Sequence, residues 1–471
     1  MNRWLCCSTA FFIAALLHAN VADAQAQAPA QAPAQPQPQP PELTDPLLTP
    51  VEAAPRRITR WSEISTNLRA RSVDLAAAVA DVRRAEADSR AAFAPLYGQI
   101  QAQGQATQNL ITKDTQQVIG ATPTGVPITE TITSPTPRAA NVGATLTLPL
   151  IAPRQWQVVK TARIGIELAD ELLGDQRRVL VERAAGAVVA VVAAERVAEI
   201  NRVGLKAALE RTNLARRGRT LGGGTSIDVV RAEQDLEAAR AQVVTGDETL
   251  RQAREALGLA LGWSEQVGVE PGFRIDDAVV EAGRQCKAVP DLDARADIVA
   301  AQTRVRLADQ VRREATWGFA PTLSVQSQVA YTTLDSTLEH PTTWTVQGVL
   351  SWDLWDGGAR YAQMQSGTAQ RERAEAALTG ARRDLAISVK RADRGVTVAT
   401  ASRDIAKRSR DSAVENDRLT RIAFQAGTGT SLELVTAAGL LRSQEIQLAI
   451  RDYELVRARL LALLVRARCD L

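Results

Sequence analysis

Histidine is nearly absent from this sequence. Of two histidines in 471 residues, His18 falls in a predicted leader, so the mature chain keeps only His340. Histidine is the most frequent general acid or base in enzymes and the commonest metal ligand. With no clustered acid pair and no nucleophile motif either, we expect no enzyme, no metal site and no cofactor. His340 stands before Pro341 in a turn-like context, and we assign it no role.

Long apolar runs are missing as well. Beyond the N-terminal stretch, no segment approaches the ~20 consecutive apolar residues that a transmembrane helix requires. This excludes a helical inner-membrane protein. The formal net charge of +3 is close to neutral and gives no reason to expect nucleic acid as a partner.

The N-terminus is typical of a secretory signal. A basic residue precedes the apolar stretch Thr9–Leu17, and the small residues Ala22-Asp23-Ala24 form a cleavage site. We therefore expect residues 1–24 to be a signal peptide. Cys6 and Cys7 lie before the apolar stretch, whereas lipoprotein processing needs a cysteine after it, so we expect no lipid anchor.

The segment after this signal is almost entirely Gln, Ala and Pro up to residue 42. Such a composition cannot bury enough apolar surface to offset the loss of chain entropy on folding. We expect residues 25–56 to form a disordered tether.

From residue 57 the chain is a duplication, in which three landmarks recur in the same order. The pairs are Phe93-Ala94-Pro95 with Phe319-Ala320-Pro321, Leu146–Leu150 with Leu350–Leu354, and Gly224–Val230 with Gly429–Val435. The sequence therefore predicts a first repeat at 57–265, a linker at 266–290 and a second repeat at 291–471. Each repeat should run helix, strand, loop, strand, very long helix, Gly-rich turn, long helix.

The two strand-to-strand loops differ in length. The first, from about Thr107 to Ala140, is rich in Thr, Pro and Gln and is typical of a solvated excursion between antiparallel strands. Its counterpart, at about 332–343, is short.

Two cysteines remain in the mature chain, Cys286 and Cys469, in a compartment where disulfides persist. A disulfide and two free thiols both fit this composition. The two residues follow corresponding helical halves, near the two chain ends of the duplication, which makes Cys286 and Cys469 the predicted pair.

The strand segments alternate between apolar and polar residues. From Leu96, an unbroken row of polar residues, Gln99 to Gln105, alternates with small and apolar ones, and 142–150, 323–331 and 344–354 follow the same rule. Such strands match the lipid and water sides of a membrane barrel, although a soluble sheet with one buried face alternates identically. The signal, the long helices, the small number of strands and the aromatic side chains favour the membrane. Those aromatic residues are Tyr331, Trp344, Trp352 and Trp355.

Four strands cannot close on themselves, and open sheet edges are not tolerated in lipid. Other subunits must therefore complete any barrel. Two subunits would give eight strands and an interior filled by side chains, whereas three would give twelve strands and a water-filled lumen. A transport duct favours the trimer.

Two very long helical patterns follow the strands, from about Pro153 to Arg217 and from Gly358 to Gln425. At 1.5 Å per residue, each would be about 100 Å long. Both end at Gly-rich turns, Gly222-Gly223-Gly224 and Gly427-Thr428-Gly429, and Thr225-Ser226 and Thr430-Ser431 are candidate N-caps of the returning helices. A phosphate-binding role for these turns is disfavoured, because no Lys follows in the P-loop pattern.

These features, with the tip segments Leu221–Arg231 and Ala426–Thr436, resemble the TolC family of outer membrane efflux proteins over the whole chain after residue 57. The resemblance implies a mainly α fold with a small β part. In that fold each chain gives four membrane strands and long helical hairpins to a trimeric 12-stranded barrel and an α-helical periplasmic tunnel. It also implies a homotrimer in the outer membrane of a Gram-negative bacterium, surrounded by outer-membrane lipid.

In that family the hairpin tips dock onto a periplasmic adaptor, which is coupled to an inner-membrane transporter, and acidic residues constrict the entrance. The matching positions here are Gly222, Gly223, Gly224, Thr225, Ser226, Asp228, Gly427, Gly429, Thr430, Ser431 and Glu433. Gly429 and Thr436 stand where some relatives have an Arg and a second Asp, so a salt-bridge latch is not carried over. Asp228 and Glu433 also fit simple helix capping, worth about 0.3–1 kcal/mol each.

The expected function is a channel subunit of a tripartite efflux pump, a passive exit duct for small molecules, because no nucleotide-binding motif is present. A type I protein secretion duct has the same fold and remains an alternative. A soluble periplasmic adaptor or coiled-coil scaffold is a third, although adaptors carry one hairpin between halves of a β-rich region rather than two hairpins that each follow strands.

Overall fold

The computed structural model describes residues 44–108, 110, 113–134, 139–273, 275–333 and 341–470. The predicted signal, residues 25–43 of the predicted tether and His340 lie outside this part of the chain. The described part is mainly helical with a small amount of sheet. None of its helices is both long enough and apolar enough to cross a membrane.

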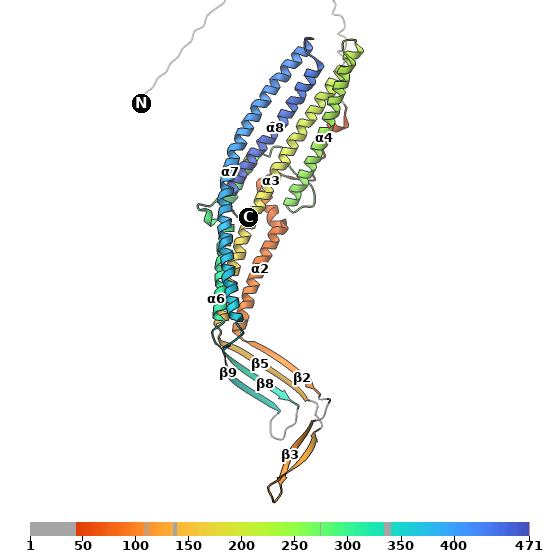
Figure 1. The fold of residues 1–471 in the computed structure, drawn as a ribbon. Coiled ribbons are helices and arrows are strands. Elements are labelled where there is room, and N and C mark those ends of the chain that lie inside the picture. Colours follow the sequence, from red (N-terminus) through yellow and green to blue (C-terminus); the bar gives the residue numbers. More distant parts are fainter. Residues whose placement is uncertain are drawn as a thin grey trace, which may run out of the picture. The chain divides into compact units, whose positions relative to one another are not determined.

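The same order of elements occurs twice (Figure 1). In the first half, α1 (Trp61–Arg71) and α2 (Val73–Phe93) precede β2 (Gln99–Thr107), β5 (Ala139–Ile151), α3 (Pro153–Thr220) and α4 (Ser226–Ala260). In the second half, α6 (Ala296–Trp317) precedes β8 (Thr322–Thr332), β9 (Thr342–Ser351), α7 (Ala359–Gln425) and α8 (Ser431–Leu464). The mainly α fold with duplicated strands and long helical hairpins is therefore confirmed.

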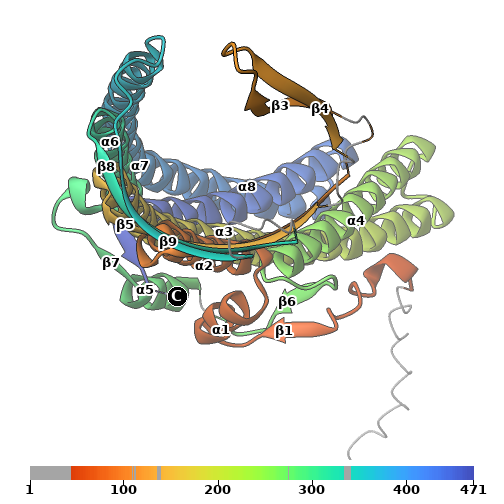
Figure 2. The same cartoon turned by 90° about the horizontal axis from the view of Figure 1, so that it is seen from below.

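The long helices α3 and α7 contain 68 and 67 residues, which corresponds to about 100 Å each. α3 begins with Pro153 in its first turn, where proline costs no hydrogen bond, and α7 begins after Gly358 in a left-handed conformation. α4 returns along α3, α8 returns along α7, and α8 also packs against α3. Seen along their axes, these helices form one curved layer, with α7 and α4 at its two edges (Figure 2).

Four strands form one antiparallel sheet in the order β2-β5-β8-β9, so β2 and β9 are its edges. The register places polar residues in rows across one face. Two such rows are Gln99, Thr147, Gln326 and Gln347, and Gln101, Thr145, Gln328 and Thr345. The Gln347 amide donates to the Gln326 side-chain oxygen at 3.2 Å. The predicted alternation therefore places one polar and one apolar face on the same sheet.

The bounds of two strands differ slightly from the sequence prediction. β2 begins at Gln99 rather than Leu96, because Ala94–Tyr97 is a 3-10 turn with Pro95 at its second position, and Gly98 has a φ of 91°. β9 ends at Ser351, so Trp352 and Leu354 lie in the following bend.

The loop predicted between residues 107 and 140 is wrong in one respect, because it contains a β-hairpin. β3 (Lys113–Ala121) pairs with β4 (Pro127–Ser134) in an antiparallel ribbon. A turn joins them, in which the Gly125 N–H donates to the Thr122 carbonyl at 2.8 Å and Gly125 has a φ of 79°. The Thr- and Gln-rich composition obscured these strands, whose large apolar residues, such as Val118, Ile119 and Ile128, are few and exposed.

The predicted tether needs correction for residues 45–56, which are packed against the first hairpin. We call Asp45–Ile58 the strap. It contains η1 (Pro46–Leu48) and β1 (Arg56–Ile58). Leu47 and Leu48 pack on a buried cluster of α3 and α4, and Arg240 pairs with Asp45 at 2.9 Å. These few apolar residues are too irregularly spaced to form a recognisable periodic pattern.

The predicted linker at 266–290 is folded and belongs to what we call the belt. The belt contains β1, α1, β6 (Val267–Val269), α5 (Ile275–Gln285), β7 (Cys286–Ala288) and β10 (Ala467–Cys469). β1 pairs with β6 and β7 pairs with β10, and the belt elements lie on the convex side of the helical layer (Figure 2).

The largest apolar core of the described chain lies where the belt meets the long helices. Side chains of α1, α3, α4 and α8 come together there, including Ile64, Leu180, Leu257 and Leu464. Cys286 and Cys469 are buried in this core and joined by a disulfide bond. Of the two possibilities that the sequence left open, the structure therefore has the bridge.

Candidate functional site

The two hairpin tips are built in the same way. Gly222 and Gly427 end the long helices with φ angles of 80° and 77°, a left-handed conformation that glycine adopts without strain. At each tip, two further backbone N–H groups donate to the same carbonyl. Gly223 and Gly224 donate to the Gly218 carbonyl, and Thr428 and Gly429 donate to the Ala423 carbonyl. The chain thereby reverses direction with most of its polar backbone satisfied.

Gly224 and Gly429 are required for a different reason, namely space. A Cβ atom on Gly224 would lie 2.9 Å from the Arg219 nitrogen, and one on Gly429 would lie 3.0 Å from the Phe424 nitrogen. Both approaches are to backbone, which cannot move aside as a flexible side chain can. A Cβ atom on Gly223, by contrast, would make only an ordinary contact, 3.9 Å from the Gly218 carbonyl oxygen, which fits the presence of Thr428 at the corresponding position.

Each returning helix begins with a capping box. The Thr225 hydroxyl accepts from the Asp228 N–H at 3.3 Å, and the Asp228 carboxylate accepts from the Thr225 N–H at 3.0 Å. Thr430 and Glu433 make the same exchange at 3.2 and 2.8 Å. The predicted N-caps are thus Thr225 and Thr430, and Ser226 and Ser431 are the first helical residues.

The two tips are also joined to each other within the chain. The Ser431 hydroxyl of the second tip donates to the Asp228 carboxylate of the first. This hydrogen bond, followed by those from the Thr225 hydroxyl and N–H, holds the pKa of Asp228 below its usual range. The N–H and hydroxyl of Thr430 likewise lower the pKa of Glu433. Both acids are therefore anionic at neutral pH, and the capping expected for them is present.

At the other end of the long helices from the tips is the sheet, whose apolar face remains exposed in the described chain. Its exposed apolar residues include Ile100, Val142, Leu146, Leu150, Val329, Val346 and Leu350. A soluble sheet with a buried face would have a second layer over these side chains, and no described element of this chain forms one. A contiguous exposed apolar surface marks contact with lipid or another protein.

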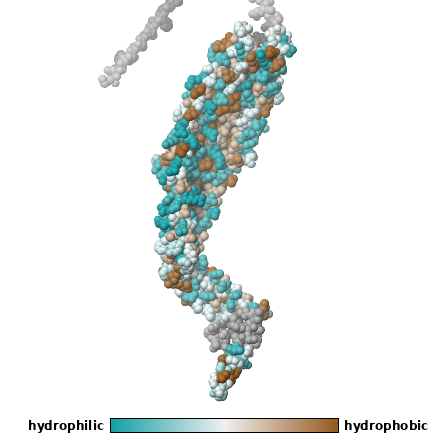
Figure 3. Space-filling model, viewed as in Figure 1, coloured by the Kyte–Doolittle hydropathy of each residue, from teal (hydrophilic) through white to brown (hydrophobic). Residues whose placement is uncertain are grey.

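Aromatic side chains stand at both ends of this face. Tyr331 and Trp344 lie toward the far end of β8 and β9, while Tyr97, Trp352 and Trp355 lie where the sheet meets the helices. From Trp344 to Trp352 the chain spans roughly 26 Å at the usual rise per residue. At a strand tilt of about 40°, this length corresponds to roughly 20 Å along the membrane normal, and aromatic girdles flank the apolar band of membrane barrels on both sides. Figure 3 shows apolar residues gathered where the helices meet the sheet, and a largely hydrophilic surface over the helices.

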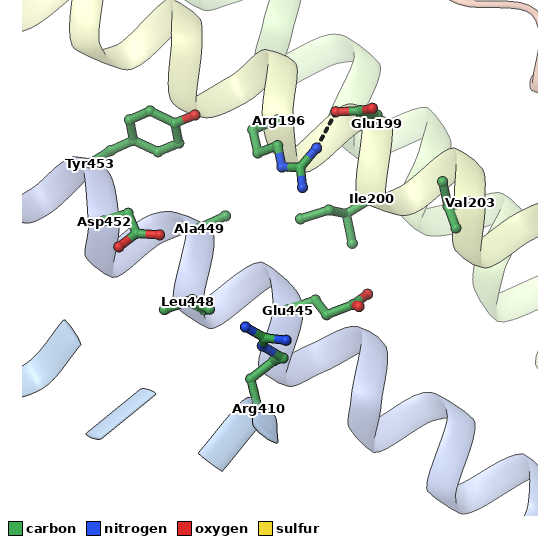
Figure 4. Close-up of a pocket in the computed structure, with 10 residues that line it drawn as sticks. All are labelled: Arg196, Glu199, Ile200, Val203, Arg410, Glu445, Leu448, Ala449, Asp452 and Tyr453. Carbon is green, nitrogen blue, oxygen red and sulfur yellow. Dashed lines mark hydrogen bonds and ion pairs between the residues drawn. The ribbon is translucent and has the colours of Figure 1, made fainter. Parts of the chain in front are cut away.

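The described helical layer contains grooves between neighbouring helices. One lies between α3, α7 and α8, where Ile200 and Ala449 face each other beside the Arg196–Glu199 ion pair of 2.5 Å (Figure 4). Its charged side chains are exposed or half-buried on the three helices. Among the described residues, no cluster of three or more His, Cys, Asp or Glu residues could hold a metal ion.

Sequence reasoning placed the helix reversals and their N-caps but missed two features of their surroundings. The first is the contact between Ser431 and Asp228, which joins residues far apart in the chain. The repeated order of hydroxyl and acid at both tips was its only signal. The second is the strap along the first hairpin, whose signal was the short apolar group Leu47, Leu48 and Val51 in an otherwise polar segment.

Comparisons with solved structures give the same fold. The outer membrane protein VceC of Vibrio cholerae is 15% identical with a TM-score of 0.68, over 87% of this chain and 97% of that one. The MtrE outer membrane channel of Neisseria gonorrhoeae is 17% identical with a TM-score of 0.68, over 88% and 93%. The CmeC outer membrane channel of Campylobacter jejuni is 12% identical with a TM-score of 0.69, over 86% and 85%.

At these identities, the three structures establish the fold alone. A comparison with curated proteins finds no match. The sequence model described as "outer membrane efflux protein" matches residues 64–263 and 291–463, which is most of both repeats. The chain, which is located in the outer membrane with a large periplasmic helical part, belongs to the outer membrane efflux protein family.

Proposed function

We propose that this chain is one of three identical subunits of a passive outer-membrane duct for small molecules. Within a tripartite pump, an inner-membrane transporter would drive export through a periplasmic adaptor and this duct. The observation that carries the proposal is the sheet, which has one apolar face and one polar face and continues directly into a curved helical layer. No described strand of the chain pairs with either of its two edges.

The unpaired edges β2 and β9 argue for assembly. Lipid contains no water to satisfy their free N–H and C=O groups, so each edge must pair with another strand. Four strands per chain make twelve in three copies, enough for a water-filled lumen lined by the Gln and Thr rows. The helical layers would then extend this lumen into the periplasm.

The hairpin tips would form the inner end of the duct. The capping boxes and the Ser431–Asp228 contact give these tips a defined shape, which a docking surface for an adaptor requires. We propose that residues 222–228 and 427–433 make this surface and surround the entrance. The charges of Asp228 and Glu433 would then face solutes that enter.

The chain offers no source of energy for transport. No phosphate-binding loop is present, and the Gly-rich turns reverse helices instead. A continuous aqueous path only lets solutes move down their gradient, so direction and selectivity would come from the partners.

Planar-bilayer recordings combined with mass determination test the proposal. Mature protein purified in detergent should have the mass of a trimer by native mass spectrometry. The same preparation should give discrete conductance steps in a planar lipid bilayer. A monomer that stays in solution without detergent and gives no conductance would contradict the duct and favour a periplasmic scaffold.

A further inference from the structure

One groove of the helical layer differs from its neighbours in charge. It has a volume of about 600 Å³, lies between α3, α4 and α8, and none of the described residues that line it is charged. Its wall is mainly alanine, valine and isoleucine, including Ala190, Ala193, Val197, Ala241, Ile446 and Ile450. Three other grooves of the described helices, among them the one in Figure 4, each contain both arginine and glutamate. An uncharged groove is thus set into a wall that is rich in charge.

This apolar groove is on the concave side of the helical layer. Arg240 and Arg254 of α4 bind the strap, which lies on the convex side with the belt (Figure 2). Thr245 and Thr249, which line the groove, lie on the opposite side of α4 from these two arginines. Figure 3 shows the concave side, where a pale brown strip runs along the middle of the helical layer. In the proposed trimer this side faces the lumen, where exported solutes pass.

One polar side chain is buried at this groove without its full set of hydrogen bonds. Asn201 of α3 is 4% exposed, and its amide N–H donates to the Gln242 carbonyl at 3.0 Å. Its Oδ1 atom accepts no hydrogen bond from any described residue. Most buried acceptors in proteins have a partner, because an unpaired one loses its bond to water without replacement. A donor group is therefore needed at this place.

The duplicated fold itself does not require this amide. Gly246 makes room for it, since a Cβ atom there would lie 2.6 Å from the Asn201 Nδ2 atom. In the register set by the two tip motifs, the matching positions of the second repeat are Ala406 and Arg451. The second hairpin therefore forms without an asparagine or a glycine at these positions.

We propose that this groove is a transit site for an exported small molecule with an uncharged, apolar body and one N–H or O–H donor. The alanine and isoleucine wall would hold the body, and the donor would bind the Asn201 Oδ1 atom. A charged body would lose its hydration here and gain no partner. The volume falls within the range of small-molecule sites, about 300–1,000 Å³. This inference rests on the duct proposed above and names a class of solute that it passes.

Competitive photolabelling tests the site. The probe is a naphthalene that carries a trifluoromethyl diazirine, added to the protein purified in detergent, irradiated and mapped by mass spectrometry. Label should appear on residues 241–253 of α4 and 446–450 of α8, and excess 2-naphthol should remove most of it. Detergent surrounds the apolar face of the sheet, so label there should rise in proportion to the probe and should not respond to 2-naphthol. The sheet thus provides the reference for label that is not bound at a site.

Two substitutions should close the groove in different ways. Thr249→Glu places a charge in it at an exposed position, and Ala190→Phe fills it without adding charge. Each should reduce the competable label on α4 and α8 severalfold. The matched control is Val203→Glu, because Val203 is 63% exposed and lines the groove of Figure 4 instead. Label should be unchanged in this control.

Asn201→Ala tests the donor, because alanine occupies the matching position of the second repeat. In the unmodified protein, 2-naphthol should compete severalfold better than 2-methoxynaphthalene, which has a similar ring system and no donor. The two compounds should compete equally in Asn201→Ala. An unchanged preference for 2-naphthol in this variant would contradict the part given to Asn201.

The outcomes separate the site from the duct, because native mass and conductance are measured on the same preparation. A conducting trimer whose label on α4 and α8 does not respond to 2-naphthol would overturn the site and leave the duct standing. Competable label in a protein that does not conduct would contradict the transit role together with the duct. Equal loss of label in Thr249→Glu and Val203→Glu would also count against the groove.

Discussion

At the scale of single residues, each tip acid first serves its own helix. A returning helix begins with several N–H groups that have no partner inside the helix, and the capping boxes satisfy two of them. Asp228 does more than Glu433 within the chain, because Ser431 also donates to it. The two acids therefore hold equivalent places in the repeats and different surroundings in the monomer.

Thr225→Ala should loosen the start of α4 without unfolding the hairpin. The change removes the hydroxyl that accepts from the Asp228 N–H and donates to the Asp228 carboxylate at 2.6 Å. Loss of such a cap costs about 1 kcal/mol, which should speed hydrogen exchange of the first-turn amides about fivefold. Thr245→Ala is the matched control, because that hydroxyl bonds only the Ala241 carbonyl of its own helix. Equal protection in both variants would contradict the role given to the cap.

The Asp228 contacts should resist mild acid and fail only in strong acid. The pKa of Asp228 is lowered in the folded protein by the Ser431 hydroxyl and then by Thr225. Its stabilising contribution is therefore complete above the ordinary pKa of about 3.9 and is lost as the pH falls through the lower folded value. Protection factors of the first-turn amides of α4 should stay constant from pH 8 to pH 5 and drop below about pH 4. Asp228→Asn should remove that drop, and a decline near pH 6 would point to another group.

At the scale of elements, the alternation of apolar and polar residues in the sheet means that its two faces should differ in how they tolerate a charged side chain. Val346→Arg places a charge on the apolar face, where arginine at the middle of a bilayer costs about 2–4 kcal/mol. Gln347→Arg, one residue further along, places the same charge on the polar face. The first variant should lose membrane-inserted protein, and the second should insert normally with an altered conductance. Comparing the two in outer-membrane fractions checks the assignment, and equal loss would argue against lipid on the Val346 side.

The long helices could be predicted from the sequence almost to the residue, because their ends carry strong local signals. Pro153 and Gly358 begin α3 and α7, and a Gly-rich turn ends each. The β3–β4 hairpin could not be predicted in the same way, since its residues alternate in no apolar pattern. The sequence did hold one sign of it, the Pro-Thr-Gly segment before Val126, which forms the turn.

At the scale of the whole molecule, the sequence predicts that the chain needs further copies of itself but not where these copies meet. The number of strands required partners, and this follows from hydrogen bonding in lipid alone. Equivalent positions of the two repeats differ in burial: Ile200 of α3 is 8% exposed, whereas Ile405 of α7 is 59% exposed. Whether a neighbouring helix buries a given position of one repeat or its equivalent in the other depends on how the two hairpins pack. No local sequence pattern contains that information.

The disulfide joins the segment between the two repeats to the end of the second repeat, so its removal should affect the C-terminal part of the chain. Cys286 and Cys469 are paired residues of β7 and β10, 183 residues apart, in the core of the belt. A bond closing so long a loop contributes about 2–5 kcal/mol. Replacing both with Ser should speed proteolysis near the C-terminus and leave conductance unchanged, since neither tip nor sheet contains the bond. Reductant should bring the unmodified protein to the same cleavage rate without affecting the variant. Equal cleavage rates for the unmodified protein and the variant before reduction would mean that packing alone holds the belt.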